Sequence, residues 1–113
     1  MKTKAESGKE GEKRAVEFLK LKGWEIRTQN YRYKHGEIDI IGLDKGVLVF
    51  VEVKFRKNNK FGFPENFVNA HKEGMVRKTA MNYIIEKKWQ SDIRFDIISI
   101  TGEETPEHFE DAF

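Results

Sequence analysis

The chain has 113 residues, of which 38% are hydrophobic and 35% are charged, and it has no cysteine. This length suits one domain over residues 1–113, and the lack of cysteine excludes disulfides and thiolate metal sites. No apolar run approaches the ~20 residues of a membrane span, and the basic N-terminus lacks the apolar segment of a signal peptide. We therefore expect a cytoplasmic protein that does not contact membranes.

Charge is unevenly distributed along the chain. Residues 1–91 hold 20 Lys and Arg against 12 Asp and Glu, whereas residues 92–113 hold one Arg against seven acids. A basic body suits a polyanion such as nucleic acid, although a solvated basic surface explains it equally well.

The first predicted element is a helix from Ser7 to Lys22. Ser7 and Glu10 have the spacing of a capping box, apolar residues follow at helical intervals, and Gly23 is placed to end the helix. Aromatic and β-branched residues then predict a bent strand over residues 24–34.

Two further strands, over residues 37–42 and 47–56, are predicted to form a hairpin. The connecting Asp44-Lys45-Gly46 suits a tight turn with positive φ. The second strand begins VLVFVEV and is almost continuously apolar, so we expect it at the centre of the sheet with both faces covered.

A loop containing Gly62 and Pro64 follows, then a helix over residues 69–88 and a strand over residues 94–100. The acidic, turn-rich segment 101–113 is expected to be partly mobile. The predicted order α-β-β-β-α-β indicates an α/β fold with a mixed central sheet flanked by helices.

Four ionisable residues interrupt the apolar hairpin: Glu37, Asp39, Glu52 and Lys54. A turn centred on Lys45-Gly46 places Asp39 directly opposite Glu52, and a three-residue turn makes them diagonal neighbours, with Cβ atoms about 5 to 8 Å apart. Two carboxylates at that distance repel each other and lose solvation, so they need a cation, Lys54 or a proton.

Converging carboxylates form an oxygen site for a hard divalent ion such as Mg²⁺. Such an ion stabilises charge on a phosphodiester and lowers the pKa of a bound water, while Lys54 positions that water or stabilises developing charge. The alternative is an ion-pair ladder on a solvated face, which explains poorly why the charges lie on the most hydrophobic strand.

Asp39 followed by Glu52-x-Lys54 resembles the D…(D/E)xK signature of the restriction-endonuclease-like superfamily of Mg²⁺-dependent DNA-cleaving enzymes. Nearly the full chain is similar to the YraN-like family of predicted endonucleases, which is related to archaeal Holliday-junction resolvases. This resemblance is carried by Gly8-x-x-Gly11-Glu12, Asn30-Tyr31-Arg32, Gly36-Glu37-Ile38-Asp39, Val49-Phe50-Val51-Glu52-Val53-Lys54-x-Arg56, Arg94-Phe95-Asp96 and Ala112-Phe113. It implies that Asp39 and Glu52 are metal ligands and that Lys54 is the catalytic lysine, with Glu12 as a catalytic acid from the helix.

The position of Glu12 in the predicted first helix also needs an explanation. Glu12 precedes Ala15 and Leu19 by three and seven residues, so it lies on the stripe that packs the first helix against the sheet. An acid there needs compensation, either from a lysine at the edge of the stripe or from a position at the rim of the Asp39 and Glu52 site, where it supports metal binding.

The other candidate site residues each allow more than one role. Basic residues beside phenylalanines predict nucleic-acid contacts. The predicted contact residues are Arg56, Lys57, Lys60 and Lys72, of which Lys72 suits an ordinary surface position equally well. Glu37 suits an auxiliary role as metal ligand, as partner of Lys54 or as a hairpin charge. Surface positions are predicted for His35, His71 and His108.

We expect a Mg²⁺-dependent DNA endonuclease, a hydrolase that accepts Mn²⁺ as a substitute, with branched DNA as a candidate substrate. The alternatives are a noncatalytic DNA-binding module, whose acids are structural or hold an ion without turnover, and an RNA-processing nuclease. Cleavage of a four-way junction requires two active sites and hence a homodimer, for which the sequence shows no interface.

Overall fold

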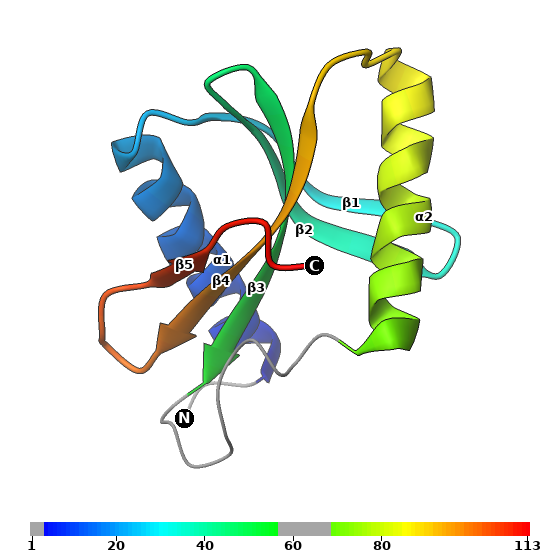
Figure 1. Cartoon of the computed structure of the whole chain (residues 1–113). Helices are drawn as coiled ribbons and strands as arrows, with labels where there is room; N and C mark the ends of the chain where they lie inside the picture. The colour runs from blue at the N-terminus through cyan, green and yellow to red at the C-terminus, as the bar shows by residue number, and fades with distance from the viewer. Residues whose placement is uncertain (1–3, 57–68) are drawn as a thin grey trace.

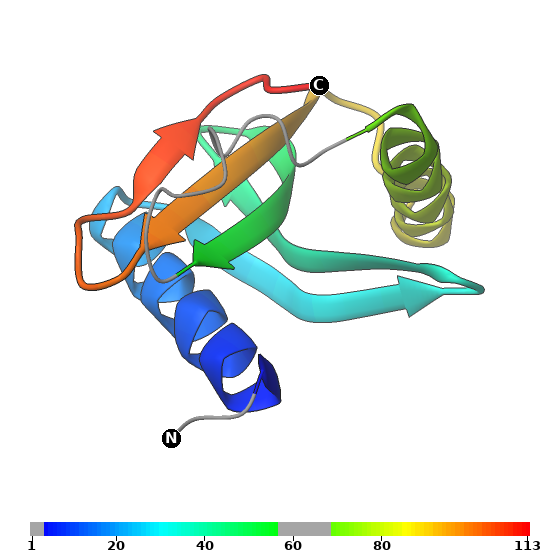
Figure 2. The ribbon, with the colours of Figure 1, turned by 90° about the horizontal axis from the view of Figure 1, so that it is seen from below.

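The structure is a computed structural model that describes residues 4–56 and 69–113. Its elements are α1 (Lys4–Leu21), β1 (Glu25–Tyr33), β2 (Gly36–Asp44), β3 (Val47–Arg56), α2 (Ala70–Lys87), β4 (Ile93–Thr101) and β5 (Glu107–Phe109). The described strands form one sheet in the order β1-β2-β3-β4-β5, in which β3 and β4 are parallel and the other neighbours antiparallel. Helices α1 and α2 lie on opposite faces of this sheet (Figures 1 and 2). The predicted α/β class and element order are confirmed, with β5 as an additional strand.

The two helices differ in how well their starts were predicted. Helix α2 matches the prediction, because the Asn69 side chain caps it by accepting from Lys72 N–H and Lys88 ends it in the left-handed region. Helix α1 begins at Lys4, so the capping box predicted at Ser7 is wrong. No helix breaker stands among the residues just before Ser7, and the helix therefore continues through them.

The β2–β3 hairpin has the turn and register expected from its sequence. Lys45 and Gly46 both have positive φ, at 50° and 86°. Backbone pairing runs from Asp44–Val47 to Ile40–Val51, as a two-residue turn requires.

Two cores cover the two faces of the sheet, and β3 contributes to both. Val49 and Val51 pack on the α1 face. Leu48 and Phe50 pack on the α2 face. The predicted central position of β3 is therefore confirmed. Within the described residues, neither helix is long and apolar enough to cross a membrane.

Two glycines allow helices and strands to approach closely. A Cβ on Gly11 of α1 would lie 3.0 Å from the Phe55 Cβ near the end of β3. A Cβ on Gly36 of β2 would overlap the Thr79 hydroxyl of α2 and lie 3.1 Å from the carbonyl oxygen of Met75. These contacts hold α1 and α2 against the same end of the β2–β3 pair.

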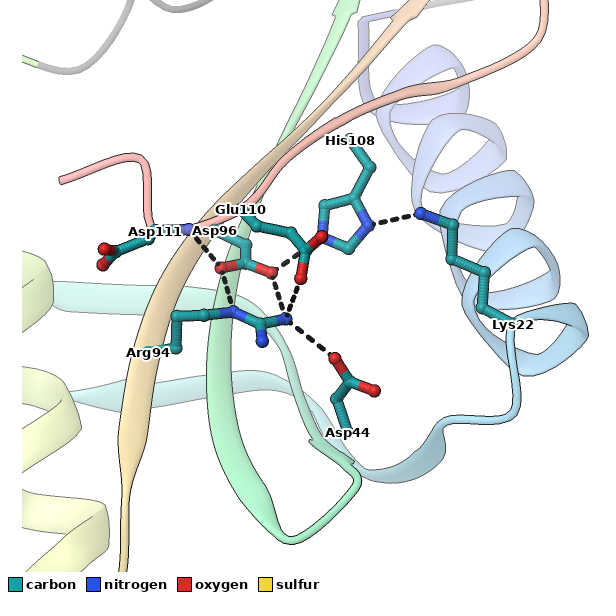
Figure 3. Close-up of polar contacts among 7 residues, drawn as sticks. All are labelled: Lys22, Asp44, Arg94, Asp96, His108, Glu110 and Asp111. Carbon is teal, nitrogen blue, oxygen red and sulfur yellow. Dashed lines mark hydrogen bonds and ion pairs between the residues drawn. The ribbon is translucent and has the colours of Figure 1, made fainter.

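The carboxylate of Asp96 organises the C-terminal part of the sheet (Figure 3). Arg94 donates to both of its oxygens, at 2.8 and 2.9 Å, and His108 Nε2 lies 2.7 Å from Oδ2. Asp111 N–H donates to Oδ1 at 2.9 Å. Burial raises the pKa of Asp96, but these hydrogen bonds outweigh burial and hold the pKa below its ordinary value.

The network around Asp96 extends to two other elements. Lys22 Nζ, just after α1, lies 2.9 Å from His108 Nδ1. Because an ammonium group only donates, His108 Nδ1 accepts and Nε2–H donates to Asp96. Arg94 also reaches Asp44, at the hairpin turn, and Glu110.

His108 is therefore not the surface histidine that was predicted. Its side chain is only 4% exposed. The reason is that β5 pairs with β4 and turns this side chain towards Asp96, a contact that the irregular, acidic local sequence does not indicate. Ala112 N–H also donates to Phe95 O at 2.7 Å, so the segment that was expected to be partly mobile packs against the sheet.

Asp96→Asn should lower the free energy of unfolding by about 3 kcal/mol, because the neutral amide leaves Arg94 poorly paired. Since the folded pKa of Asp96 is lowered, its contribution is present above the ordinary pKa of 3.8 and is lost as the pH falls through the folded pKa. Urea unfolding from acidic to neutral pH should therefore show a shallower acid dependence for the variant. Asp92→Asn is the exposed control, and an equal acid dependence in wild type and Asp96→Asn would contradict the assignment.

Candidate functional site

The candidate site lies where β2 and β3 separate. Beyond the Ile40–Val51 pair, β2 continues beside β1 and β3 continues beside β4 (Figure 1). At this fork the Asp39 Oδ2 accepts from Val53 N–H at 2.8 Å. A side-chain carboxylate thus takes the place of a backbone acceptor, which fixes the orientation of Asp39.

Three carboxylates meet at the fork. Glu12 from α1, and Glu37 and Asp39 from β2, each offer an oxygen, and these oxygens all lie within 4.8 Å of one another. Glu12 reaches this position because its neighbour Gly11 lets α1 approach β3. The structure therefore places Glu12 beside Asp39, at the rim of the site.

Asn30 and Arg32 of β1 partly compensate these acids. With its amide nitrogen facing the carboxylates, Asn30 donates to Glu12 Oε1 at 2.8 Å and to Glu37 Oε1 at 3.2 Å. Arg32 lies opposite Glu37 across the strand pair and contacts its carboxylate at 2.9 Å. Asn30 was not predicted as a site residue, although it interrupts a strand pattern and belongs to the Asn30-Tyr31-Arg32 element of the family resemblance.

Glu52 lies on the β3 side of the fork, with its side chain 5% exposed. Lys72, in the first turn of α2, holds the Glu52 Oε2 at 2.9 Å. Lys72 was predicted as a surface or phosphate-binding residue, and the structure shows that it is the ion-pair partner of Glu52. The pairing joins elements far apart in the sequence and leaves no local pattern.

Burial and neighbouring charges shift the pKa values of four groups at the site, Glu12, Asp39, Glu52 and Lys54. Burial, followed by the charge of Asp39, raises the pKa of Glu12 to about 7. Burial is also the largest cause of the raised pKa values of Asp39 and Glu52. Burial and then Lys72 lower the pKa of Lys54 to about 8. Shifts of this kind in one cleft are typical of functional sites.

An open pocket of about 540 Å³ is lined by Glu37, Asp39 and Glu52. It lies between β2, β3 and α2, and we call it the acidic cleft. Its lining residues are His35, Gly36, Glu37, Asp39, Glu52, Val53, His71, Lys72, Met75 and Val76. His35 and His71 are exposed, as predicted.

The donor set at the fork fits a hard divalent ion, because three converging carboxylate oxygens are the ligands that Mg²⁺ and Mn²⁺ prefer. Glu12, Glu37 and Asp39 form this group. Glu52 was predicted as a ligand beside Asp39, but in this structure its Oε2 is occupied by Lys72.

Two of the predicted nucleic-acid contacts, Lys57 and Lys60, lie outside the described residues. Arg56 ends β3 and its backbone carbonyl accepts from Gly102 N–H at 2.7 Å. Its half-buried side chain leaves less charge on the surface than the sequence suggested.

The order α-β-β-β-α-β, with acids at a fork of the sheet and a lysine on β3, defines an α/β protein with a restriction-endonuclease-like core. A model of the uncharacterised protein family UPF0102 matches residues 11–100, and the chain belongs to this family. It is 44% identical over 107 residues to a UPF0102 protein of Cytophaga hutchinsonii, covering 95% of each chain. It is 45% identical over 108 residues to a UPF0102 protein of Thermodesulfovibrio yellowstonii, covering 96% of each chain. The predicted membership of the YraN-like family is confirmed by these matches.

Above pH 7, where Glu12 is mostly ionised, Glu12→Gln should raise the free energy of unfolding in the presence of a chelator, because it removes one of three neighbouring negative charges. We expect a gain on the order of 0.5–1 kcal/mol, since solvent screens a side chain this exposed. Glu17→Gln, an exposed acid on the same helix, should change stability by less than about 0.5 kcal/mol. Urea titrations of the three proteins measure the difference, and destabilisation by Glu12→Gln would show that Glu12 is a structural ion-pair partner.

Proposed function

We propose that this protein is a Mg²⁺-dependent endonuclease that hydrolyses DNA phosphodiester bonds. The observation that carries the proposal is the convergence of Glu12, Glu37 and Asp39 beside the Glu52–Lys72 ion pair. A structural ion-pair ladder would match each acid with a base. This site instead gathers more acids than bases, and the pKa of Glu12 is raised to about 7.

The carboxylates of Glu12, Glu37 and Asp39 would hold the ion. When bound, Mg²⁺ would supply electrostatic stabilisation of a phosphodiester and increase the acidity of a nearby water. Asp39 is held by Val53 N–H, and Glu12 and Glu37 by Asn30, so the oxygens are oriented before any ligand arrives. This preorganisation lowers the cost of binding.

The lysines of the site would act on the phosphate. In hydrolysis a water oxygen forms a bond to phosphorus while one bond to a sugar oxygen breaks, and a proton passes from the water to the leaving oxygen. Lys54, beside Lys72, would donate to the phosphate oxygens as negative charge develops on them. Lys72 would compensate Glu52 and keep a second positive charge at the cleft.

DNA as the substrate rests on the resemblance to the restriction-endonuclease-like superfamily, and nucleic acid in general is favoured by the basic composition of residues 1–91. The runner-up, a noncatalytic DNA-binding module, uses the same acids without turnover. Cleavage assays with linear, flapped and four-way DNA, and with matched RNA, separate these functions and report any preference for branched DNA.

Mg²⁺ or Mn²⁺ at millimolar levels should raise the melting temperature, because binding to the folded state alone stabilises it by RT ln(1 + [L]/Kd), about 2.7 kcal/mol at a hundred times Kd. Asp39→Asn should remove most of this gain. Asp92→Asn, an exposed acid outside the site, should keep it. Thermal melts with added metal or chelator test the prediction, and identical curves for wild type under both conditions would count against the metal site.

Lys54→Gln should reduce DNA cleavage by roughly 10²–10³-fold, because it removes a donor that stabilises charge in the transition state. The three carboxylates remain, so metal binding and DNA binding should persist. Lys87→Gln on the exposed face of α2 removes the same charge and should leave cleavage intact. Gel assays of a labelled substrate measure the rate, and a wild-type protein that cuts none of the substrates with either metal would favour the DNA-binding module.

A further inference from the structure

A second pocket adjoins the acidic cleft, between α2 and the tip of the β1–β2 hairpin, which crosses behind this helix in Figure 1. It has a volume of about 510 Å³, and we call it the hairpin groove. Its lining residues are Tyr33, Lys34, His35, Met75, Lys78, Thr79, Met81, Asn82 and Ile85. His35 and Met75 line both pockets, so the groove and the acidic cleft are direct neighbours.

The charged side chains that line the hairpin groove are basic. Lys34, His35 and Lys78 are basic, and none of the nine residues that line the groove in the described part of the chain is acidic. All three basic residues are exposed. A lining of this kind attracts an anion, and its position beside the cleft suits a ligand that carries several phosphates.

Apart from Thr79 and Asn82, the rest of the lining is apolar or aromatic. Met81 is 54% exposed and Ile85 is 68% exposed, and Tyr33 lies at the end of β1 beside them. Duplex DNA presents phosphates to such a surface but keeps its bases stacked inside. An unpaired strand offers both phosphates and bases, and bases favour aromatic and apolar contacts.

The groove is held open by contacts between the hairpin and α2. Asn82 of α2 donates to the Tyr31 hydroxyl of β1 at 2.6 Å. Gly36 of β2 packs directly against Thr79, where a Cβ would not fit. The distance between hairpin and helix is therefore set by the folded chain before a ligand binds.

We propose that the hairpin groove binds an unpaired nucleic-acid segment next to the phosphodiester held in the acidic cleft. The proposal rests on the proposed function and deepens it. Lys34 and Lys78 contact phosphates of the segment, and Tyr33, Met81 and Ile85 contact its bases. The preferred substrates are then duplexes with a single-stranded arm at the cleavage site.

The test compares a blunt duplex with the same duplex carrying an oligo-dT arm, by fluorescence anisotropy in the presence of a chelator. Wild type should bind the armed duplex about tenfold more tightly, and Lys34→Asn/Lys78→Gln should remove this preference while keeping affinity for the blunt duplex. The salt slope on the armed duplex should fall by about 1.4, for two phosphate contacts on a single strand.

The control is Lys45→Asn/Lys87→Gln. Lys34 and Lys45 both occupy left-handed turn positions, which asparagine tolerates, and Lys78 and Lys87 are both exposed on α2. The control should keep the tenfold preference. Equal loss in both double variants, or equal affinity of wild type for both duplexes, would overturn the proposal.

Two further results separate this proposal from its alternatives. If light scattering shows a dimer that Ile85→Glu dissociates, the groove is a subunit interface and the proposal falls. If the preference for the armed duplex depends on Lys34 and Lys78 but no nucleic acid is cleaved, binding of an unpaired segment in the groove is supported and the nuclease proposal fails. If the blunt duplex is cleaved without any arm preference, the nuclease proposal stands and the groove fails.

Discussion

The hydrogen bond from Val53 N–H to the Asp39 carboxylate is the constraint on which the arrangement of the site depends. It lies where backbone pairing between β2 and β3 stops, so the sheet divides into a β1–β2 arm and a β3–β4 arm. Side chains on the inner edges of the two arms then face a cleft instead of another strand. Glu52 and the carboxylates of β2 thereby line a cleft in a sheet that is otherwise tightly covered.

Gathering these acids is unfavourable for folding, and the rest of the molecule offsets the cost. Two continuous cores cover β3 on both faces, and the Asp96 network ties α1, the hairpin turn and β5 together away from the fork. The close contacts of Gly11 with the Phe55 side chain and of Gly36 with the Thr79 side chain bring both helices to the fork. Functional proteins often place charges unfavourably at one site and offset the cost by favourable packing elsewhere.

The sequence predicted those features that depend on local chemistry. Lys45-Gly46 determined the turn and thereby the register that brings Asp39 to Glu52, and Asn69 marked the start of α2. The place of Glu12 beside Asp39 was expected from the packing stripe of its helix and from the family resemblance, but other contacts between distant residues leave no local pattern. The Lys72–Glu52 ion pair and the burial of His108 under β5 depend on how whole elements pack. Asn30 was missed for the same reason, since its partner Glu12 lies on another element.

The parallel pairing of β3 with β4 has a consequence for synthesis of the chain. Because α2 separates the two strands in sequence, β3 leaves the ribosome before its partner and presents an unpaired apolar edge. The run VLVFV has the composition of segments that stack between chains and aggregate. Glu52 and Lys54 follow this run directly, and in-register stacking would place like charges on one another. Two residues proposed for the chemistry of the site would therefore also disfavour self-association of the nascent chain.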